Sequence, residues 1–289
     1  MKKMALIGLI LSAVTVGVYG NEDVIPSFKA GQFEIFVLVE SERDGNAGIL
    51  VGADDAILQR YIPEEGFKHT ANAVLVKTPK MNILIDSGTG AGDIIINKIK
   101  SLGIEPEKIN AVLITHLHGD HFGSLQRDGQ AVFPNAKVYL SKRDVEYFTV
   151  TNPNQGAINA LAPYKSNTVT FDPASLSARR KPEILPGVIP IAAYGHTPGH
   201  TIFQLESGRE KFLVIADLLH VALVQFPMPS ISATYDVDQA LAARTRQEVL
   251  AYAAQNKIPV AGMHIVNPGM GMVETNKEGG FLFKPIERK

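Results

Sequence analysis

Three histidines and one aspartate lie within a single short segment, HLHGDH (His116–His121), that directly follows an apolar run. The run Ala111–Ile114 is typical of a buried strand, so the segment is expected in a loop at the end of a sheet, where imidazoles are held rigidly. In extended backbone the first two histidines project to the same side and can share one metal ion. The glycine then lets the chain turn and aim the aspartate and third histidine at a neighbouring point. Two metal ions, roughly 3.5–4 Å apart, are the natural occupants.

Further metal-ligand side chains follow other apolar runs. The segment GHTPGH (195–200) follows one predicted strand, Asp217 ends the run Phe212–Ala216, and His264 ends the run Val260–Met263. Histidine nitrogen and aspartate oxygen together form a ligand set suited to zinc and tolerated by manganese, cobalt or iron. The sequence therefore predicts a two-metal site assembled from several strand ends.

Composition narrows the chemistry further. The 289 residues include eight histidines and no cysteine, which excludes disulfides, thiolate nucleophiles, iron–sulfur clusters and thiolate-bound zinc. A formal charge of −1 gives no indication of nucleic-acid binding. With 45% hydrophobic and 20% charged residues, the chain is typical of a globular protein with a large core.

The order of the apolar runs predicts an α+β fold. Strands are expected at 33–39, 72–78, 82–86, 109–116, 136–141, 188–194, 201–207, 211–217, 258–264 and 280–286, and helices at 92–103, 142–148, 157–162 and 236–255. Strands and helices in this order suggest two β-plus-α halves packed as layers around paired sheets. We expect residues 21–289 to form a single domain.

The N-terminus predicts export. Lys2 and Lys3 precede an unbroken apolar run from Met4 to Val18, and the small Gly20 offers a cleavage point. Residues 1–20 are therefore expected to be a signal peptide, and the mature protein to be periplasmic or secreted and off the membrane. A retained anchor is the alternative, although the apolar run is shorter than the roughly 20 residues that span a bilayer.

Taken together, the LIDSG strand (84–88), HLHGDH, GHTPGH, Asp217 and His264 resemble the metallo-β-lactamase superfamily. The resemblance implies a four-layer αβ/βα sandwich and two divalent metal ions, with Zn²⁺ favoured. The implied ligands are His116, His118 and His200 on one metal, Asp120, His121 and His264 on the other, and Asp217 between them. It also implies that Asp86 orients a ligand imidazole and that His196 bonds within its own loop.

Within the superfamily, GHTPGHT, IADLLHVALVQF and the short tail MHIVNPGMGMVE resemble methyl parathion hydrolase, dihydrocoumarin hydrolase and the N-acyl homoserine lactonases. This resemblance implies hydrolysis of lactones or aryl esters by a bridging hydroxide, with phosphotriester cleavage left open as a side activity. Asp120 would carry the proton to the leaving group. His220 stands where the lactonases place a tyrosine and would stabilise the developing oxyanion. The expected partner is a small-molecule substrate, and both a monomer and a homodimer are left open.

Two alternatives to this function stay open. One is periplasmic β-lactamase activity, although the commonest β-lactamases of the superfamily use a cysteine at the position of Asp217, and the all-histidine subclass lacks that aspartate. The other is a non-catalytic metal-binding module on the same scaffold, against which the intact ligand set argues.

Overall fold

The structure is a computed structural model that describes residues 24–286. The signal peptide predicted over residues 1–20 lies outside the described residues. Over 24–286, none of the helices combines the length and the apolar character that crossing a bilayer requires.

The first of the two large sheets has seven strands. In spatial order they are β1 (Ser27–Ala30), β2 (Phe33–Asp44), β4 (Lys68–Lys77), β5 (Asn82–Ile85), β6 (Ile109–Leu113), β9 (Lys137–Ser141) and β10 (Thr168–Phe171). The pairs from β1 to β5 are antiparallel, and the pairs from β5 to β10 are parallel. Residues 78–81 form the hairpin connection between the antiparallel strands β4 and β5.

The second large sheet has six strands. In spatial order they are β11 (Val188–Ala192), β12 (Thr201–Ser207), β13 (Glu210–Ala216), β15 (Val260–Gly262), β16 (Met270–Thr275) and β17 (Phe281–Pro285). Only β13 and β15 run parallel; the other neighbours in this sheet are antiparallel.

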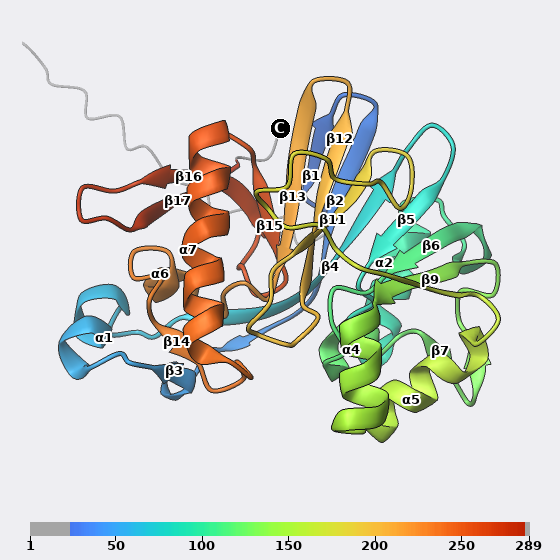
Figure 1. Cartoon of the computed structure of the whole chain (residues 1–289), viewed down its shortest axis with the longest axis horizontal. Helices are drawn as coiled ribbons and strands as arrows, with labels where there is room; N and C mark the ends of the chain where they lie inside the picture. Colours follow the sequence, from blue (N-terminus) through green and yellow to red (C-terminus); the bar gives the residue numbers. More distant parts are fainter. Residues whose placement is uncertain (1–23, 287–289) are drawn as a thin grey trace, which may run out of the picture.

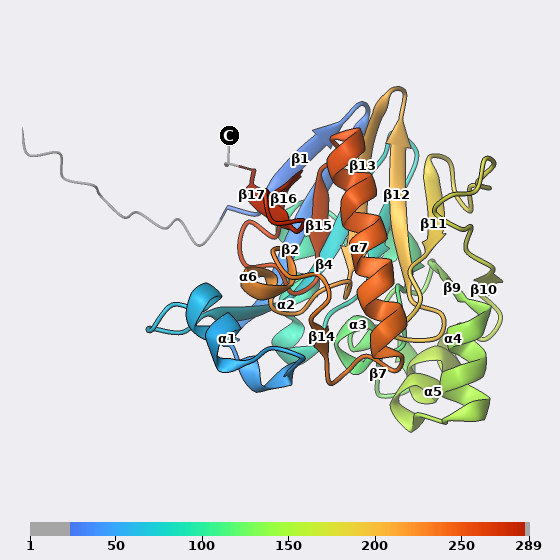
Figure 2. The ribbon, with the colours of Figure 1, turned by 60° about the vertical axis from the view of Figure 1, so that its left-hand side comes forward.

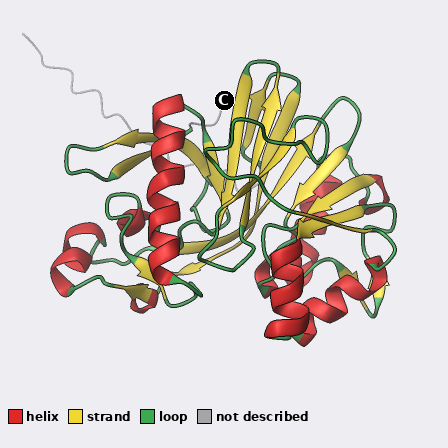
Figure 3. Cartoon of the chain, viewed as in Figure 1, coloured by secondary structure: helices red, strands yellow, loops and turns green. Residues whose placement is uncertain are grey.

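The two sheets pack face to face, with helices on both outer sides (Figures 1 and 3). Alternate residues of β2, such as Ile35 and Val37, point into a core that they share with Phe203, Phe212 and Val214 of the second sheet. A second core joins the other face of the first sheet to α2 (Ile94–Ser101) and α5 (Gln155–Leu161). A third lies under α7 (Gln239–Asn256), which crosses the second sheet in Figure 2. The predicted four-layer α+β sandwich is confirmed.

Shorter elements connect these layers. They are β3 (Leu50–Val51), α1 (Asp55–Tyr61), α3 (Gly119–Phe122), β7 (Gln126–Arg127), β8 (Gln130–Ala131), α4 (Lys142–Glu146), α6 (Ala222–Gln225), β14 (Ser232–Ala233) and five short 3₁₀ or π turns at 47–49, 91–93, 106–108, 147–151 and 162–164.

The sequence patterns did not predict α1 or β16. The strand β16 contains Gly271 and forms because β15 and β17 bond to both of its edges, which is a long-range cause.

Strand direction explains where the polar segments meet. The parallel strands β5 and β6 end just before Asp86 and the HLHGDH segment, and the parallel strands β13 and β15 end just before Asp217 and His264. Carboxyl ends of parallel strands lie at one edge of a sheet, and here the two edges adjoin. The fold therefore gathers segments from both halves of the chain at one place.

Candidate metal centre

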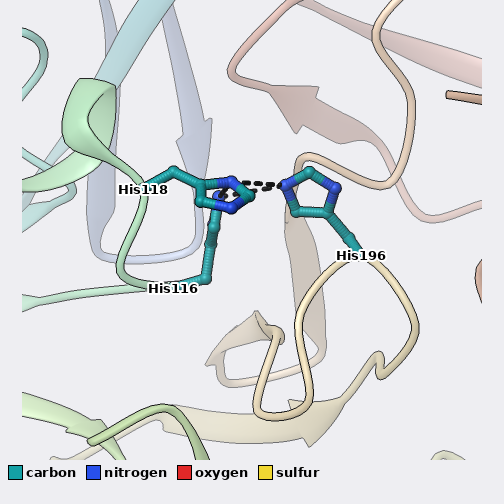
Figure 4. A group of neighbouring side chains, drawn as sticks. All are labelled: His116, His118 and His196. Carbon is teal, nitrogen blue, oxygen red and sulfur yellow. Dashed lines mark hydrogen bonds between the residues drawn. The ribbon is translucent and has the colours of Figure 1, made fainter. Parts of the chain in front are cut away.

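Three imidazoles from two loops point toward one another (Figure 4). Nδ1 of His118 lies 3.0 Å from Nε2 of His116 and 3.0 Å from Nε2 of His196, and the two Nε2 atoms are 3.1 Å apart. His116 and His118 come from the loop after β6, and His196 comes from the loop after β11. We call these three residues the histidine group.

The outer nitrogen of His196 fixes the state of its ring. Nδ1–H of His196 donates to Oδ1 of Asp236 at 2.9 Å, which leaves the inward Nε2 with a lone pair. Asp236 is in turn held by the fully buried Arg246, whose guanidinium lies 3.5 Å away. Burial lowers the pKa of His116 well below its usual value and that of His196 to about 3, so these imidazoles are neutral near pH 7. Three neutral imidazoles whose inward nitrogens converge in this way suit a metal ion between them.

Four other side chains form a second cluster, which we call the carboxylate group: Asp120, His121, Asp217 and His264. Nε2 of His264 lies 2.9 Å from Oδ2 of Asp217, and Nε2 of His121 lies 3.3 Å from Oδ1 of the same carboxylate. Asp120 is 3.6 Å from both imidazoles. The outward Nδ1–H of His121 donates to Asp86 at 2.7 Å, as the resemblance implied, and that of His264 donates to the Thr70 carbonyl at 2.7 Å.

The electrostatics of the carboxylate group differ from those of the histidine group. Burial works to lower the pKa of His121, but the carboxylates of Asp217, Asp120 and Asp86 outweigh it and raise that pKa well above its usual value. Burial works to raise the pKa of Asp217, but His121 and His264 outweigh it and lower that pKa well below its usual value. Nε2 of His121 and Oδ1 of Asp217 are nonetheless buried without a hydrogen-bond partner in the described part of the chain. Such orphaned atoms fit a missing cation.

Asp217 joins the two groups. Besides its contacts with His121 and His264, its Oδ2 lies 3.5 Å from Nε2 of His196 and 3.8 Å from Nε2 of His116. The register of β13 against β15 shifts just before it, and Ala216 adopts a φ of 48°, in the left-handed region. A non-glycine residue there stores strain of order 1 kcal/mol, and such strain is found where a side chain must be aimed.

The structure places His196, and not His200, in the histidine group. His200 was expected to bind metal, but both of its ring nitrogens contact backbone: Nδ1–H donates to the Ala193 carbonyl at 2.8 Å, and Nε2 accepts from the Asp217 amide at 3.3 Å. His196 was expected to bond within its loop, and it instead completes the histidine group. The reason is the hydrogen bond that Nδ1–H of His196 donates to Asp236, which holds the His196 ring with its Nε2 facing inward.

His220 and His69 flank the carboxylate group. Nε2 of His220 lies 3.3 Å from Oδ2 of Asp217, and its ring stacks on that of His264, with centroids 5.0 Å apart. It is close enough either to face a substrate or to add a ligand. His69 on β4 also stacks on the ring of His264, with ring centroids 4.5 Å apart, and burial lowers the pKa of His69 to about 4. His69 is partly buried and packs against the site from β4.

Asp144, at the start of α4, ties together the two loops that carry the histidine group. Oδ1 accepts from the Gly199 amide at 2.6 Å, and Oδ2 accepts from the Leu117 amide at 3.1 Å and the Thr197 hydroxyl at 3.0 Å. A Cβ at Gly199 would lie 2.7 Å from Oδ1, so only glycine permits this approach. Sequence reasoning missed both Asp144 and Asp236; an acidic residue at a helix start is ordinarily read as a cap.

Comparisons with known proteins agree with this geometry. The family model described as "Metallo-beta-lactamase superfamily" matches residues 67–256. An N-acyl homoserine lactonase from a Bacillus species is 27% identical over 115 residues, which cover 40% of this chain and 40% of the lactonase. The matched region thus spans less than half the length of that relative.

Solved structures match over most of the chain. A hydrolase called AbOPH, of the β-lactamase superfamily, is 28% identical, with 92% of this chain and 98% of that chain covered and a TM-score of 0.82. AidC, a dizinc quorum-quenching lactonase, shares the fold at 24% identity, with the same coverage and a TM-score of 0.77. The family model, the paired sheets and the histidine and aspartate cluster at their adjoining edges lead to one conclusion: the chain belongs to the metallo-β-lactamase superfamily.

Proposed function

We propose that this protein is a hydrolase that uses two divalent metal ions, with Zn²⁺ favoured, to cleave lactones or aryl esters. The observation that carries the proposal is the meeting of the histidine group and the carboxylate group at a single carboxylate, Asp217. The residues that would hold the metals are His116, His118 and His196 on one side, Asp120, His121 and His264 on the other, and Asp217 between them.

The donor set fits such a pair of ions. The inward Nε2 of His196 carries a lone pair, and the carboxylate group has buried atoms without a hydrogen-bond partner in the described part of the chain. Two divalent ions, when bound, would supply Lewis acidity and an activated water as the nucleophile near neutral pH.

The chain's own residues supply the remaining chemistry. The Asp120 carboxylate is about one-third exposed, so it is the acid in the carboxylate group that substrate and solvent can reach, and it would pass a proton to the leaving group. His220 would donate a hydrogen bond to the oxygen on which charge develops, because its ring lies beside Asp217 and its Nδ1 has no partner within residues 24–286.

We further propose that the mature protein acts outside the cytoplasm, in the periplasm or after secretion. The support is the sequence from Lys2 to Gly20 alone. Its partner would then be a small molecule in that compartment. Mass spectrometry of the mature N-terminus tests this proposal, and an uncleaved chain would overturn it.

A substrate panel tests the activity. Zinc-loaded protein, with metal content measured, is assayed against a homoserine lactone, an aryl acetate, an aryl phosphotriester and nitrocefin, beside protein depleted of metal by a chelator. We expect zinc-dependent cleavage of the lactone or the aryl ester. Cleavage of nitrocefin alone would support the β-lactamase alternative, and zinc binding without any cleavage would support the non-catalytic one.

A further inference from the structure

Arg246 on α7 is buried behind the metal centre, although the proposed chemistry makes no use of its charge. The helix reaches this place because it packs along the loop that carries His196: the Thr245 hydroxyl donates to the Tyr194 carbonyl at 2.8 Å. Only 1% of Arg246 is exposed to solvent. Arginine is almost never buried to this extent unless partners satisfy its charge and its N–H groups, so the contacts of Arg246 indicate what it does.

The guanidinium of Arg246 connects the surroundings of Asp217 with those of His196. Its Nε–H donates at 2.6 Å to the carbonyl of Leu218, the residue that follows Asp217. Its Nη2 lies 3.5 Å from Oδ2 of Asp236, and Oδ1 of that carboxylate accepts the hydrogen bond from His196. One planar group therefore contacts both the backbone beside Asp217 and the carboxylate that orients His196.

The same guanidinium supports the segment that carries His220. Its Nη1 donates to the carbonyl of Pro229 at 2.9 Å and to that of Ile231 at 2.6 Å. The Ile231 carbonyl also accepts from Nε2 of the buried Gln225 at 3.0 Å, and Oε1 of Gln225 accepts from the His220 amide at 2.6 Å. Arg246 thus shares an acceptor with the side chain that holds the His220 backbone.

These contacts require the shape of an arginine side chain. Arginine carries five N–H groups in one plane with fixed directions, whereas a lysine ammonium carries three donors at a single point. The acceptors around Arg246 are three carbonyls and one carboxylate, from four different residues. A lysine ammonium could pair with the Asp236 carboxylate, but it could not contact all four acceptors at once.

We propose that Arg246 is a positioning residue of the metal centre, which holds His196 and Asp217 at their present separation, 3.5 Å between Nε2 and Oδ2. The inference rests on the proposed hydrolase function and deepens it. Within residues 24–286, the hydrogen bonds of Arg246 reach none of the proposed metal ligands directly. Arg246 therefore acts through Asp236 and through the backbone that follows Asp217.

The test is a competitive zinc titration of Arg246→Met beside two controls on the same helix. Methionine has no N–H group, so we expect zinc to bind about 10- to 100-fold more weakly, as for other residues that orient ligands. Leu250→Ala opens a cavity in the core under α7 and lowers stability away from the site, so it should keep the wild-type zinc affinity. Arg244→Met changes an exposed arginine and should alter neither property. Denaturant unfolding gives the stability of each variant, so that affinities are compared for folded protein.

Equal weakening of zinc binding in Arg246→Met and Leu250→Ala would overturn the proposal, because Arg246 would then act on stability alone. If Arg246→Met does not fold, Arg246→Lys takes its place, since it keeps the charge beside Asp236. Zinc binding about tenfold weaker than in the wild type would support the proposal. Wild-type affinity in Arg246→Lys would overturn it.

Nitrogen NMR of the imidazole rings separates this proposal from the function on which it rests. In protein treated with a chelator it reports the tautomer of His196, and the hydrogen bond to Asp236 requires the Nδ1–H form. We expect this form to dominate in the wild type and in Leu250→Ala, and to lose its dominance in Arg246→Met. If the wild type binds no zinc, the hydrolase proposal fails, and the tautomer still decides the role of Arg246: an unchanged tautomer in Arg246→Met would overturn it.

Discussion

The histidine group and the carboxylate group adjoin one another but prepare for a cation in different ways. Burial keeps His116 and His196 neutral, so each has a nitrogen lone pair available to bind a metal ion. In the carboxylate group, nearby carboxylates raise the pKa values of His121 and His264, so that protons partly take the place of a cation. A metal ion must displace those protons, whereas the histidine group releases none. The centre thus combines neutral histidines in one group with oppositely charged histidines and aspartates in the other.

Asp217→Asn should have the largest effect, because this residue belongs to both halves. An amide keeps the shape of the side chain but removes the charge that His121 and His264 face. Loss of groups that merely orient a ligand costs about 10- to 100-fold in metal affinity or activity; we expect more than about 100-fold for this shared ligand. Zinc content and kcat/KM measure the effect. Retention of two zinc ions and full activity would refute the bridging position.

Replacing His196 and His200 separately compares a proposed ligand with a neighbour that contacts only backbone. His196→Ala should reduce bound zinc from two equivalents toward one and abolish most activity. His200→Ala should retain two equivalents, but it leaves the Ala193 carbonyl and the Asp217 amide without their side-chain partner. We expect it to lower the free energy of unfolding by about 1–3 kcal/mol. Zinc titration and denaturant unfolding on both variants measure these effects, and the opposite pattern would restore the assignment made from sequence.

The same pair shows how far the sequence alone predicts the site. Ligand type and the strand ends could be read from HLHGDH, Asp217 and His264, because a polar residue after a buried run is a local signal. Which histidine of GHTPGH turns inward could not be read, because Asp236 decides it from 40 positions away. Asp144 was missed for the same reason: its partners are loops more than 25 residues distant in sequence.

The secondary structure shows the same difference between local signals, which can be read from the sequence, and long-range contacts, which cannot. The strand β12 and the helix α7, which is rich in alanine, glutamine and arginine, were predicted nearly in place, whereas β2 continues beyond its predicted end at Val39 to Asp44. The segment around β16 contains glycine and becomes a strand only because its neighbours bond to it. Local signals therefore predict helices, strands and the types of metal ligand. Long-range contacts decide where an element begins and ends and which way a side chain points.

The two groups can also be perturbed one at a time through the carboxylates behind them. Asp236→Asn weakens the bond that holds His196, and Asp86→Asn weakens the bond that holds His121. Each should lower the affinity of its own metal about 10- to 100-fold and leave the other metal less affected. Competitive zinc titration that resolves two binding steps measures this. If both variants weaken the same step, the division into two groups is wrong.

The effect expected of Asp144 is on stability and not on metal binding, because its contacts hold the two loops of the histidine group together. Burial raises the pKa of Asp144 to about 6, from a usual value of 3.8. Since the folded pKa is the higher one, the protonated carboxyl stabilises the folded state fully below about pH 4, and this contribution is lost as the pH rises to about 6. Asp144→Asn removes that titration and one hydrogen-bond acceptor.

The free energy of unfolding of wild type minus that of Asp144→Asn should therefore be larger at pH 4 than at pH 7, by roughly 2 kcal/mol, because most of a pKa difference of about two units is spanned between these pH values. Denaturant unfolding in the presence of a chelator measures the difference without interference from bound metal. A difference that grows toward pH 7 would mean that Asp144 is stabilised as a carboxylate by its three donors, and that charge, not burial, dominates at the junction of the two loops.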